Sequence, residues 1–123
     1  MIDLKTKKIL STAFCKGKIH DFKLFKESRI FCDILHKILA DSGYQGILAI
    51  HKNSEIPQKN TKKTPLTKEQ KQKNKKLSSK RIFVENVIAS VKRFRILKHT
   101  YRNRRKRFYL RFNLISAIHN FEL

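Results

Sequence analysis

Residues 80–94 read KRIFVENVIASVKRF, and this stretch has the strongest periodicity in the chain. Its apolar residues recur at steps of three and four: Val84, Val87, Ile88, Val91 and Phe94. Steps of that size place side chains on one face of an α-helix. We therefore predict a helix here whose apolar face packs on a core.

The predicted helix begins further upstream and is followed by a second one. Thr67-Lys68-Glu69-Gln70 has the spacing of a capping box and follows Pro65, which predicts a helix start. Leu77-Ser78-Ser79 marks a point where this helix could break or be capped again. The last helix is expected after residue 107 and has two apolar stripes. One stripe holds Phe108, Phe112, Ile115 and His119, and the other holds Leu110, Leu114, Ala117 and Phe121.

The first part of the chain predicts short strands joined by turns. Residues 9–15 are apolar and partly β-branched, so we predict a strand, preceded by a turn at residues 5–8. Met1 to Leu4 would then be the end of an earlier strand. Asp21 is predicted as the N-cap of a short helix that ends near Ser28.

A buried strand over residues 34–40, followed by Asp41 and a glycine turn, is the simplest interpretation of the next segment. Residues 51–66 are polar, contain both prolines and show no periodicity, so we predict a surface loop. With 123 residues, 40% of them apolar, the chain is expected to form about one small α/β domain.

The charge of the chain limits its partners. It has 30 Lys and Arg against 9 Asp and Glu, a formal net charge of +21. A compact chain with this excess repels itself unless a polyanion neutralises it, and nucleic acid is the expected polyanion. Within the basic run of residues 98–107, the candidate phosphate ligands are Arg102, Arg104, Arg105 and Arg107. The alternative is a solvated basic turn between helices.

Two further features describe the expected setting. Cys15 and Cys32 show neither a CxxC motif nor metal-ligand spacing, so we interpret both as small buried hydrophobes in a reduced, cytoplasmic context. No apolar run approaches the ~18 residues of a membrane span, so no membrane partner is expected. A DNA-binding protein of this kind would be associated with the nucleoid when it is bound.

Glu85 and Asp41 are the candidate catalytic carboxylates. Glu85 lies in the apolar part of the predicted helix, where a buried carboxylate must be paired or bind a metal. The alternative is an i−4 ion pair with Arg81 on a solvated face. Asp41 directly follows the predicted strand. Its alternative is an ordinary turn residue, because Asp-Ser-Gly is favourable turn chemistry.

These residues carry a resemblance to a known family. Leu39-Ala40-Asp41-Ser42-Gly43-Tyr44 resembles the second-aspartate motif of insertion-sequence DDE transposases, in the group related to Harbinger elements. Arg81, Glu85 and Lys92 match the C-terminal signature of that superfamily, although Ser78 stands where the signature has a tyrosine. Gly17-Lys18-Ile19-His20-Asp21 resembles the group's glycine and His-Asp motif. The resemblance covers essentially the whole chain.

The resemblance implies a partial ribonuclease-H-like fold that cleaves and joins DNA phosphodiesters with Mg²⁺ or Mn²⁺. Asp41, Glu85 and Lys92 would be catalytic, and Asp41 and Glu85 would ligate the metal. Arg81, Lys92 and the arginines of residues 98–107 would contact DNA at transposon ends. Carboxylate oxygens are ligands that Mg²⁺ prefers, and two such ions can activate the attacking oxygen and stabilise the leaving oxygen.

The family's first catalytic aspartate lies upstream of the His-Asp motif, where this chain has only Asp3. We interpret Asp3 as a strand-end or turn residue and Asp21 as a helix cap. The expected protein is therefore a truncated transposase that lacks the first strand and is inactive alone. Residues 1–97 would form the partial catalytic domain, and residues 98–123 its basic helical end. The missing N-terminal half or a second copy would be further partners.

Two other interpretations remain open. A small basic protein without enzymatic activity would bind nucleic acid whether or not Mg²⁺, Asp41 or Glu85 is present. A chain that lacks one strand could also fail to fold stably, because an unpaired sheet edge and part of the core would be exposed.

Overall fold

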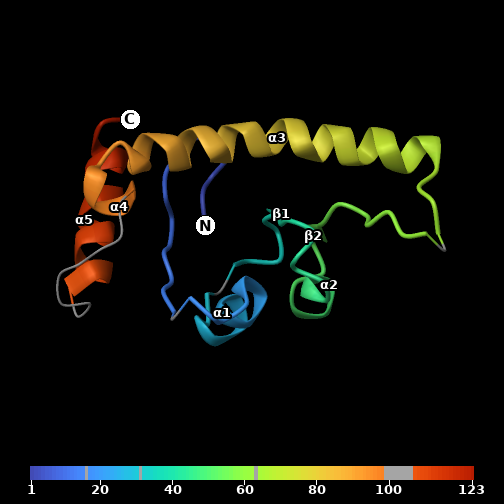
Figure 1. Ribbon diagram of the computed structural model, residues 1–123, viewed down its shortest axis with the longest axis horizontal. Coiled ribbons are helices and arrows are strands. Elements are labelled where there is room, and N and C mark those ends of the chain that lie inside the picture. Colours follow the sequence, from blue (N-terminus) through green and yellow to red (C-terminus); the bar gives the residue numbers. More distant parts are fainter. Residues whose placement is uncertain (16, 31, 63, 99–106) are drawn as a thin grey trace. The chain divides into compact units, whose positions relative to one another are not determined.

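The computed structural model describes residues 1–15, 17–30, 32–62, 64–98 and 107–123. In chain order, the elements within these ranges are α1 (Asp21–Glu27), β1 (Ile38–Leu39), α2 (Ile47–Ile50), β2 (Ser54–Glu55), α3 (Lys68–Lys92), α4 (Arg95–Lys98) and α5 (Phe108–Phe121) (Figure 1). This mixture of helices with a small parallel sheet is compatible with the predicted α/β class.

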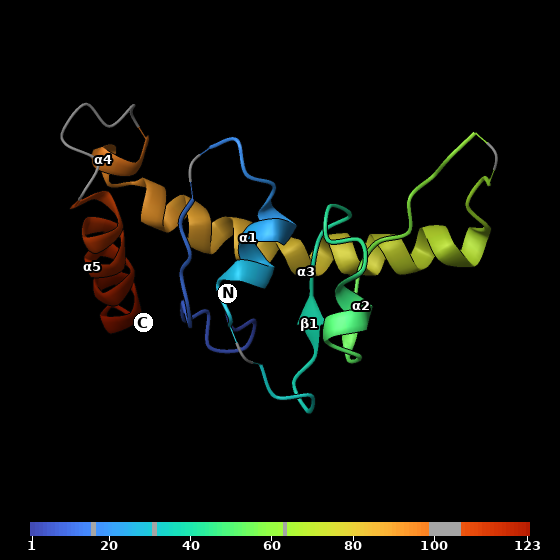
Figure 2. The ribbon, with the colours of Figure 1, turned by 90° about the horizontal axis from the view of Figure 1, so that it is seen from below.

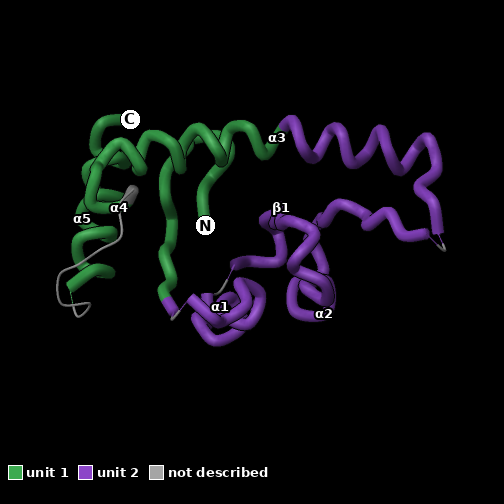
Figure 3. The backbone as a smooth tube through the Cα atoms, viewed as in Figure 1, with its two compact units in different colours: residues 1–14, 80–123 green, residues 15–79 purple. Residues whose placement is uncertain are grey.

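The chain divides into two compact units (Figure 3). Residues 15–79 form the first, here called the strand unit because it contains β1 and β2. Residues 1–14 and 80–123 form the second, here called the helical unit. Helix α3 is continuous over Lys68–Lys92 (Figure 2), and the boundary between the two units falls within it.

The sheet of the strand unit joins two parallel strands through a short helix. Ile38 pairs with Ser54 and Leu39 with Glu55. Helix α2 makes the connection between them, and its Ile47 is fully buried, with 0% of its surface exposed. The strand predicted at residues 34–40 is thus confirmed only at Ile38 and Leu39, and it ends just before Ala40 and Asp41. Its predicted burial is wrong, because these two residues are half-buried and Ile34 and Leu35 are exposed.

The loop predicted at residues 51–66 contains β2, so that prediction is wrong at Ser54 and Glu55. Neither residue has the apolar or β-branched character of a typical strand. They become a strand because α2 returns the chain to β1. There, the N–H of Ile38 donates to Asn53 O at 3.0 Å, and the N–H of Ala40 donates to Glu55 O at 3.0 Å.

The strand predicted at residues 9–15 is also wrong, because only Ile9 makes a bridge, to Ile2 in the antiparallel sense. Both backbone polar groups of Ile9 hydrogen-bond the side chain of Asn120 in α5. The Ile9 N–H donates to Asn120 Oδ1 at 2.7 Å, and Asn120 Nδ2 donates to Ile9 O at 2.9 Å.

The turn that precedes Ile9 is confirmed, and Asp3 organises it. The carboxylate of Asp3 accepts hydrogen bonds from the Thr6 hydroxyl and from the backbone N–H groups of Lys5 and Thr6. The Thr6 hydroxyl first, and then the Lys5 N–H, holds the pKa of Asp3 below its usual value. Asp3 is therefore a turn residue, as we interpreted it.

Helix α1 and its N-cap each begin one residue earlier than predicted. His20 is the N-cap, and its Nδ1 accepts a hydrogen bond from the N–H of Phe22 at 3.2 Å. Asp21 is instead the first helical residue. The prediction of Asp21 as N-cap is therefore wrong, because either neighbouring side chain can accept a hydrogen bond from an N–H of the first turn.

The start of α3 confirms the predicted capping box. The N–H of Thr67 donates to Gln70 Oε1 at 2.9 Å, and the N–H of Gln70 donates to Thr67 Oγ1 at 3.3 Å. The break suggested at Leu77-Ser78-Ser79 is absent, since α3 is continuous there. The hydroxyl of Ser79 donates to the carbonyl oxygen of Lys75, so this serine is accommodated inside a regular helix.

The core of the helical unit follows the predicted periodicity with one exception. The buried apolar side chains of this unit are Val87, Val91 and Ile115. Ile88, which belongs to the predicted stripe, has 41% of its surface exposed. Phe14 packs edge-on against Phe108 and Phe112 of α5. The first predicted stripe of α5 thus faces the core, whereas the second is exposed.

The two cysteines are not buried as predicted. Cys15 is exposed and Cys32 is half-buried, and both are free thiols. Cys15 lies in an irregular segment before α1, where its Sγ contacts the carbonyl oxygen of Ile19 at 4.0 Å. Within the described part of the chain, no helix combines the length and apolar character that a bilayer crossing requires.

Candidate functional site

Asp41 forms a tight turn at the end of β1. Its Oδ1 accepts a hydrogen bond from the N–H of Gly43 at 2.8 Å, and its carbonyl oxygen accepts one from the N–H of Tyr44 at 3.2 Å. A Cβ atom at position 43 would lie 3.0 Å from Asp41 Oδ1. Glycine at this position therefore allows the carboxylate to fold back over the turn, which fixes its orientation.

The His-Asp motif lies beside the Asp41 turn. His20 Cε1 is 3.7 Å from the position that a Cβ at Gly43 would occupy. The ring of Tyr44 packs edge-on against Phe22 at 5.8 Å and Phe25 at 6.0 Å between centroids, which anchors α1 on the turn. Two motifs that the sequence separates by some twenty residues are thus neighbours in the strand unit.

The pKa of the Tyr44 hydroxyl depends on the burial and the charge around this turn. Burial raises the pKa of the Tyr44 hydroxyl, and the carboxylates of Asp21 and Asp41 raise it further. Both carboxylates are therefore close enough to act on one phenol. The sequence pattern predicts only that Phe22 and Phe25 share one side of a short helix, and it does not predict that this helix meets Tyr44.

In the helical unit, the three signature residues Arg81, Glu85 and Lys92 are exposed on α3. The expectation that Glu85 is carried into an apolar face is wrong. Glu85 is two positions from the buried Val87, which places it about 200° around the helix from that side chain. Among the described residues, no ion pair joins Arg81 to Glu85. All three side chains thus face solvent and can meet a ligand from outside.

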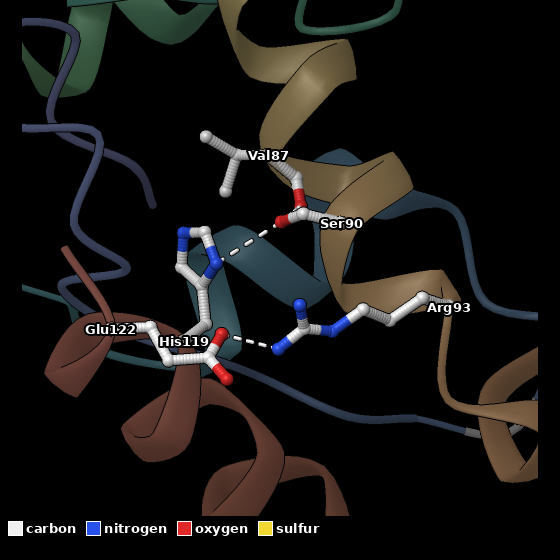
Figure 4. A network of polar contacts seen from close by, with 5 residues as sticks. All are labelled: Val87, Ser90, Arg93, His119 and Glu122. Atoms are coloured by element: carbon white, nitrogen blue, oxygen red, sulfur yellow. Dashed lines mark hydrogen bonds and ion pairs between the residues drawn. The ribbon is translucent and has the colours of Figure 1, made fainter.

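The end of α3 that carries Lys92 is held by polar contacts to α5 (Figure 4). Ser90 Oγ donates to Val87 O at 2.8 Å and lies 3.0 Å from Nδ1 of the buried His119. Arg93 forms an ion pair with Glu122. The other ring nitrogen of His119 lies 3.4 Å from the carbonyl oxygen of Lys7. These contacts fix the direction of α3 around Lys92.

Sequence reasoning placed His119 on an apolar stripe but did not find its partner Ser90. The signal was available, because a histidine on a buried stripe requires a polar group opposite it. Ser90 lies one turn before Phe94, among the apolar residues of α3, and it is the serine that meets this requirement.

The candidate DNA-binding arginines are placed only in part. Arg102, Arg104 and Arg105 lie outside the described residues. Arg107 is exposed and directly precedes α5, where its side chain makes no capping hydrogen bond.

The two candidate metal ligands belong to different units. Asp41 lies in the strand unit and Glu85 in the helical unit. Over the ranges that the structure describes, no group of three or more His, Cys, Asp or Glu side chains is arranged to hold a metal ion. Each carboxylate has the oxygen atoms that Mg²⁺ or Mn²⁺ takes as ligands. The carboxylate oxygens of Asp41 and Glu85 therefore fit a hard divalent ion as ligands.

The class of this protein follows from its comparison with known families. It belongs to the DDE superfamily endonucleases, whose family profile matches residues 1–120. The chain is also 50% identical, over all 123 of its residues, to a probable transposase for insertion sequence element IS702 from Microchaete diplosiphon. The match covers 100% of this chain and 45% of that relative. No solved structure matches the chain. The family resemblance seen in the sequence is confirmed.

Proposed function

We propose that this chain supplies part of the catalytic domain of a transposase that cleaves and rejoins DNA with divalent metal ions. The observation that carries the proposal is that the chain holds both motif carboxylates in accessible settings, Asp41 oriented at a strand end and Glu85 exposed on a long helix. The 50% identity to a probable transposase over the whole chain supports the same activity. Residues 1–97 would carry the carboxylates, and residues 98–123 a basic end that contacts DNA.

The arrangement of elements is consistent with a ribonuclease-H-like domain. A parallel strand pair with a helical connection is the repeating unit of α/β sheets. β1, α2 and β2 form such a unit on a small scale. In the proposed fold, β1 presents Asp41 at its carboxyl end, and the following α3 presents Glu85.

Each residue has a proposed role in the reaction. Asp41 and Glu85 would hold Mg²⁺ or Mn²⁺, and the hydrogen bond from the Gly43 N–H keeps the Asp41 carboxylate in one orientation. Bound divalent ions supply activation of the attacking oxygen and stabilisation of the leaving oxygen at a phosphodiester. Lys92 and Arg81 would hold phosphate oxygens, since both are exposed cations on the same helix as Glu85.

The third carboxylate of the family would come from the missing N-terminal half or from a second, intact transposase copy. We therefore propose that the chain alone does not cleave DNA. A chimera that joins it to the part of the IS702 relative outside the match is proposed to be active.

The test is a DNA-cleavage assay with this chimera on a duplex that carries transposon ends. The chimera should cleave with Mg²⁺, and Asp41→Asn or Glu85→Gln should each reduce the rate at least a hundredfold, because a lost metal ligand removes transition-state stabilisation. Glu27→Gln is the matched control, since this exposed carboxylate forms an ion pair with Lys23 on its own helix and belongs to none of the catalytic motifs. Full activity of the Asp41→Asn or Glu85→Gln protein would refute the assignment.

A second function is supported by the charge alone. With a net charge of +21, the chain could bind nucleic acid without catalysing any reaction. In that case DNA affinity would not change on addition of Mg²⁺ or on substitution of Asp41 or Glu85. The proposed transposase function instead predicts that Mg²⁺ strengthens DNA binding only while both carboxylates are present.

A further inference from the structure

The first three turns of α3, residues 68–79, carry a cluster of lysines that the candidate site does not include. This segment has five lysines and a single acidic residue, Glu69. The lysines are Lys68, Lys71, Lys73, Lys75 and Lys76, and all five are exposed. The whole segment belongs to the strand unit.

The lysines form two rows along the helix. Lys68, Lys71 and Lys75 make the first row, and Lys73 and Lys76 make the second. At 3.6 residues per turn, the rows lie about 140° apart around the helix axis. Both rows are therefore on the outer side of α3, with Gln72 between them.

The opposite side of this segment is anchored to the rest of the strand unit. Asn74 Oδ1 accepts a hydrogen bond from the N–H of Gln58 at 3.0 Å, and Asn74 Nδ2 donates to Gln58 O at 2.9 Å. Leu77, on the same side as Asn74, is buried. These contacts fix which side of the helix is covered, and they leave both lysine rows to solvent.

The clustering of lysines opposes the stability of the helix. Lys71 and Lys75 are four residues apart, and Lys73 and Lys76 three apart, which are the spacings at which like charges repel on a helix. Lys68 and Lys71 also lie in the first turn, where the helix dipole favours acidic side chains. Within the described ranges, none of the five forms an ion pair. A polyanion would relieve this repulsion.

The rows match the geometry of duplex DNA. Along the first row, the rise between successive lysines is about 4.5 and 6 Å. B-DNA has one phosphate charge per about 1.7 Å of helix axis, so each lysine can find a phosphate. A helix with its side chains is about 10–12 Å across, and the major groove is about 12 Å wide with a phosphate backbone along each edge.

We propose that the first three turns of α3 are a DNA-binding surface, with each lysine row facing one phosphate backbone of a duplex. This surface is separate from Arg81, Lys92 and Arg107. It rests on the proposed function in one respect, that the substrate is duplex DNA. Its contacts to phosphate are independent of sequence, so it positions the DNA and does not select the target site.

The test measures the affinity of the 123-residue chain for a random-sequence 30-base-pair duplex by fluorescence anisotropy over a range of KCl concentrations. The first-row variant is K68Q/K71Q/K75Q, and the second-row variant is K73Q/K76Q. The control is K8Q/K18Q/K52Q, which removes three exposed lysines elsewhere and so matches the charge change of the first-row variant. Circular dichroism melting without DNA is recorded for every variant.

The salt dependence of DNA affinity should show how many phosphate contacts each variant has lost. The slope of log affinity against log salt concentration should fall by about 2.7 for the first-row variant and about 1.8 for the second, because each phosphate contact contributes about 0.9. The control should change the slope by less than a single contact does. Without DNA, both row variants should melt at the same temperature as the unmodified chain or higher, since like-charge repulsion is removed.

Two results would overturn the inference. One is a row variant that keeps the slope of the unmodified chain or loses no more than the control. The other is a row variant that melts at a lower temperature, which would assign its lysines to the stability of the fold. If the unmodified chain does not bind the duplex at all, the proposed function fails in its choice of substrate and this surface falls with it.

Discussion

The strand unit and the helical unit each hold one of the two candidate carboxylates, and they hold it by different means. Asp41 is positioned by tertiary contacts: a two-residue strand, a turn closed by Gly43 and the packing of α1 on Tyr44. Glu85 is positioned by the periodicity of α3 alone, on the side away from the buried Val87. Perturbing the small core should therefore disturb Asp41 far more than Glu85.

The largest effect is expected from Ile47→Ala in the strand unit. Ile47 is the one fully buried large side chain among the described residues, so its truncation should lower the free energy of unfolding by about 2–5 kcal/mol. Leu48→Ala, on the same helix but with 51% of Leu48 exposed, is the control and should change it by less than about 0.5 kcal/mol. Urea denaturation measures both. Equal effects would mean that Ile47 contributes no more to the core of this unit than the exposed Leu48 does.

A smaller effect is expected from Thr67→Ala at the start of α3. The substitution removes the oxygen that accepts the Gln70 N–H and should cost about 1 kcal/mol. Far-ultraviolet circular dichroism during urea denaturation would follow the loss. Thr64→Ala, in the loop before the helix, is the control. If the two variants unfold alike, the capping box does not stabilise α3.

The aromatic contact that joins α1 to the Asp41 turn should show a coupling of similar or lesser size. In a double-mutant cycle with Phe22→Leu and Tyr44→Leu, the coupling energy should be about 0.5–1.5 kcal/mol, because the rings pack edge-on at 5.8 Å. The same cycle for Phe22 and the exposed Tyr109 should give no coupling. Additive effects at Phe22 and Tyr44 would contradict the packing.

The smallest effect concerns pH. Burial and the charges of Asp21 and Asp41 raise the pKa of the Tyr44 hydroxyl, so folding disfavours the phenolate. The stability this contributes is present below the ordinary tyrosine pKa of about 10 and is lost as pH rises through the higher folded value. Melting temperatures between pH 9 and 11 should therefore fall less steeply for Tyr44→Phe than for the unmodified chain. Parallel curves would show that Tyr44 is not in this environment.

The sequence predicted those features that depend on neighbouring residues. The start of α3 followed from Thr67 and Gln70 because a capping box is local chemistry, and the end of β1 followed from the glycine turn after Asp41. β2 could not be predicted, because Ser54 and Glu55 form a strand only once α2 has brought them to β1.

The candidate site divides in the same way. Motif spacing singled out Asp41 and Glu85 as candidates, but it did not show that Glu85 is exposed, since that depends on which side of α3 meets the core. The contact of His20 with the Asp41 turn was also missed. It depends on Tyr44 packing against α1, and such a contact between distant segments leaves no periodic signal in the sequence.

The proposed function requires that Asp41 and Glu85 both hold metal ions for one reaction, although they belong to different units. The most direct measurement is the cleavage rate of the chimera carrying Glu85→Cys or Asp41→Cys, with Mg²⁺ and then with Mn²⁺. A thiolate is a poor ligand for the hard Mg²⁺ and a better one for the softer Mn²⁺. Each variant should lose cleavage with Mg²⁺ and regain part of it with Mn²⁺. Cleavage that persists with Mg²⁺, or that Mn²⁺ restores for neither variant, would contradict the proposed function.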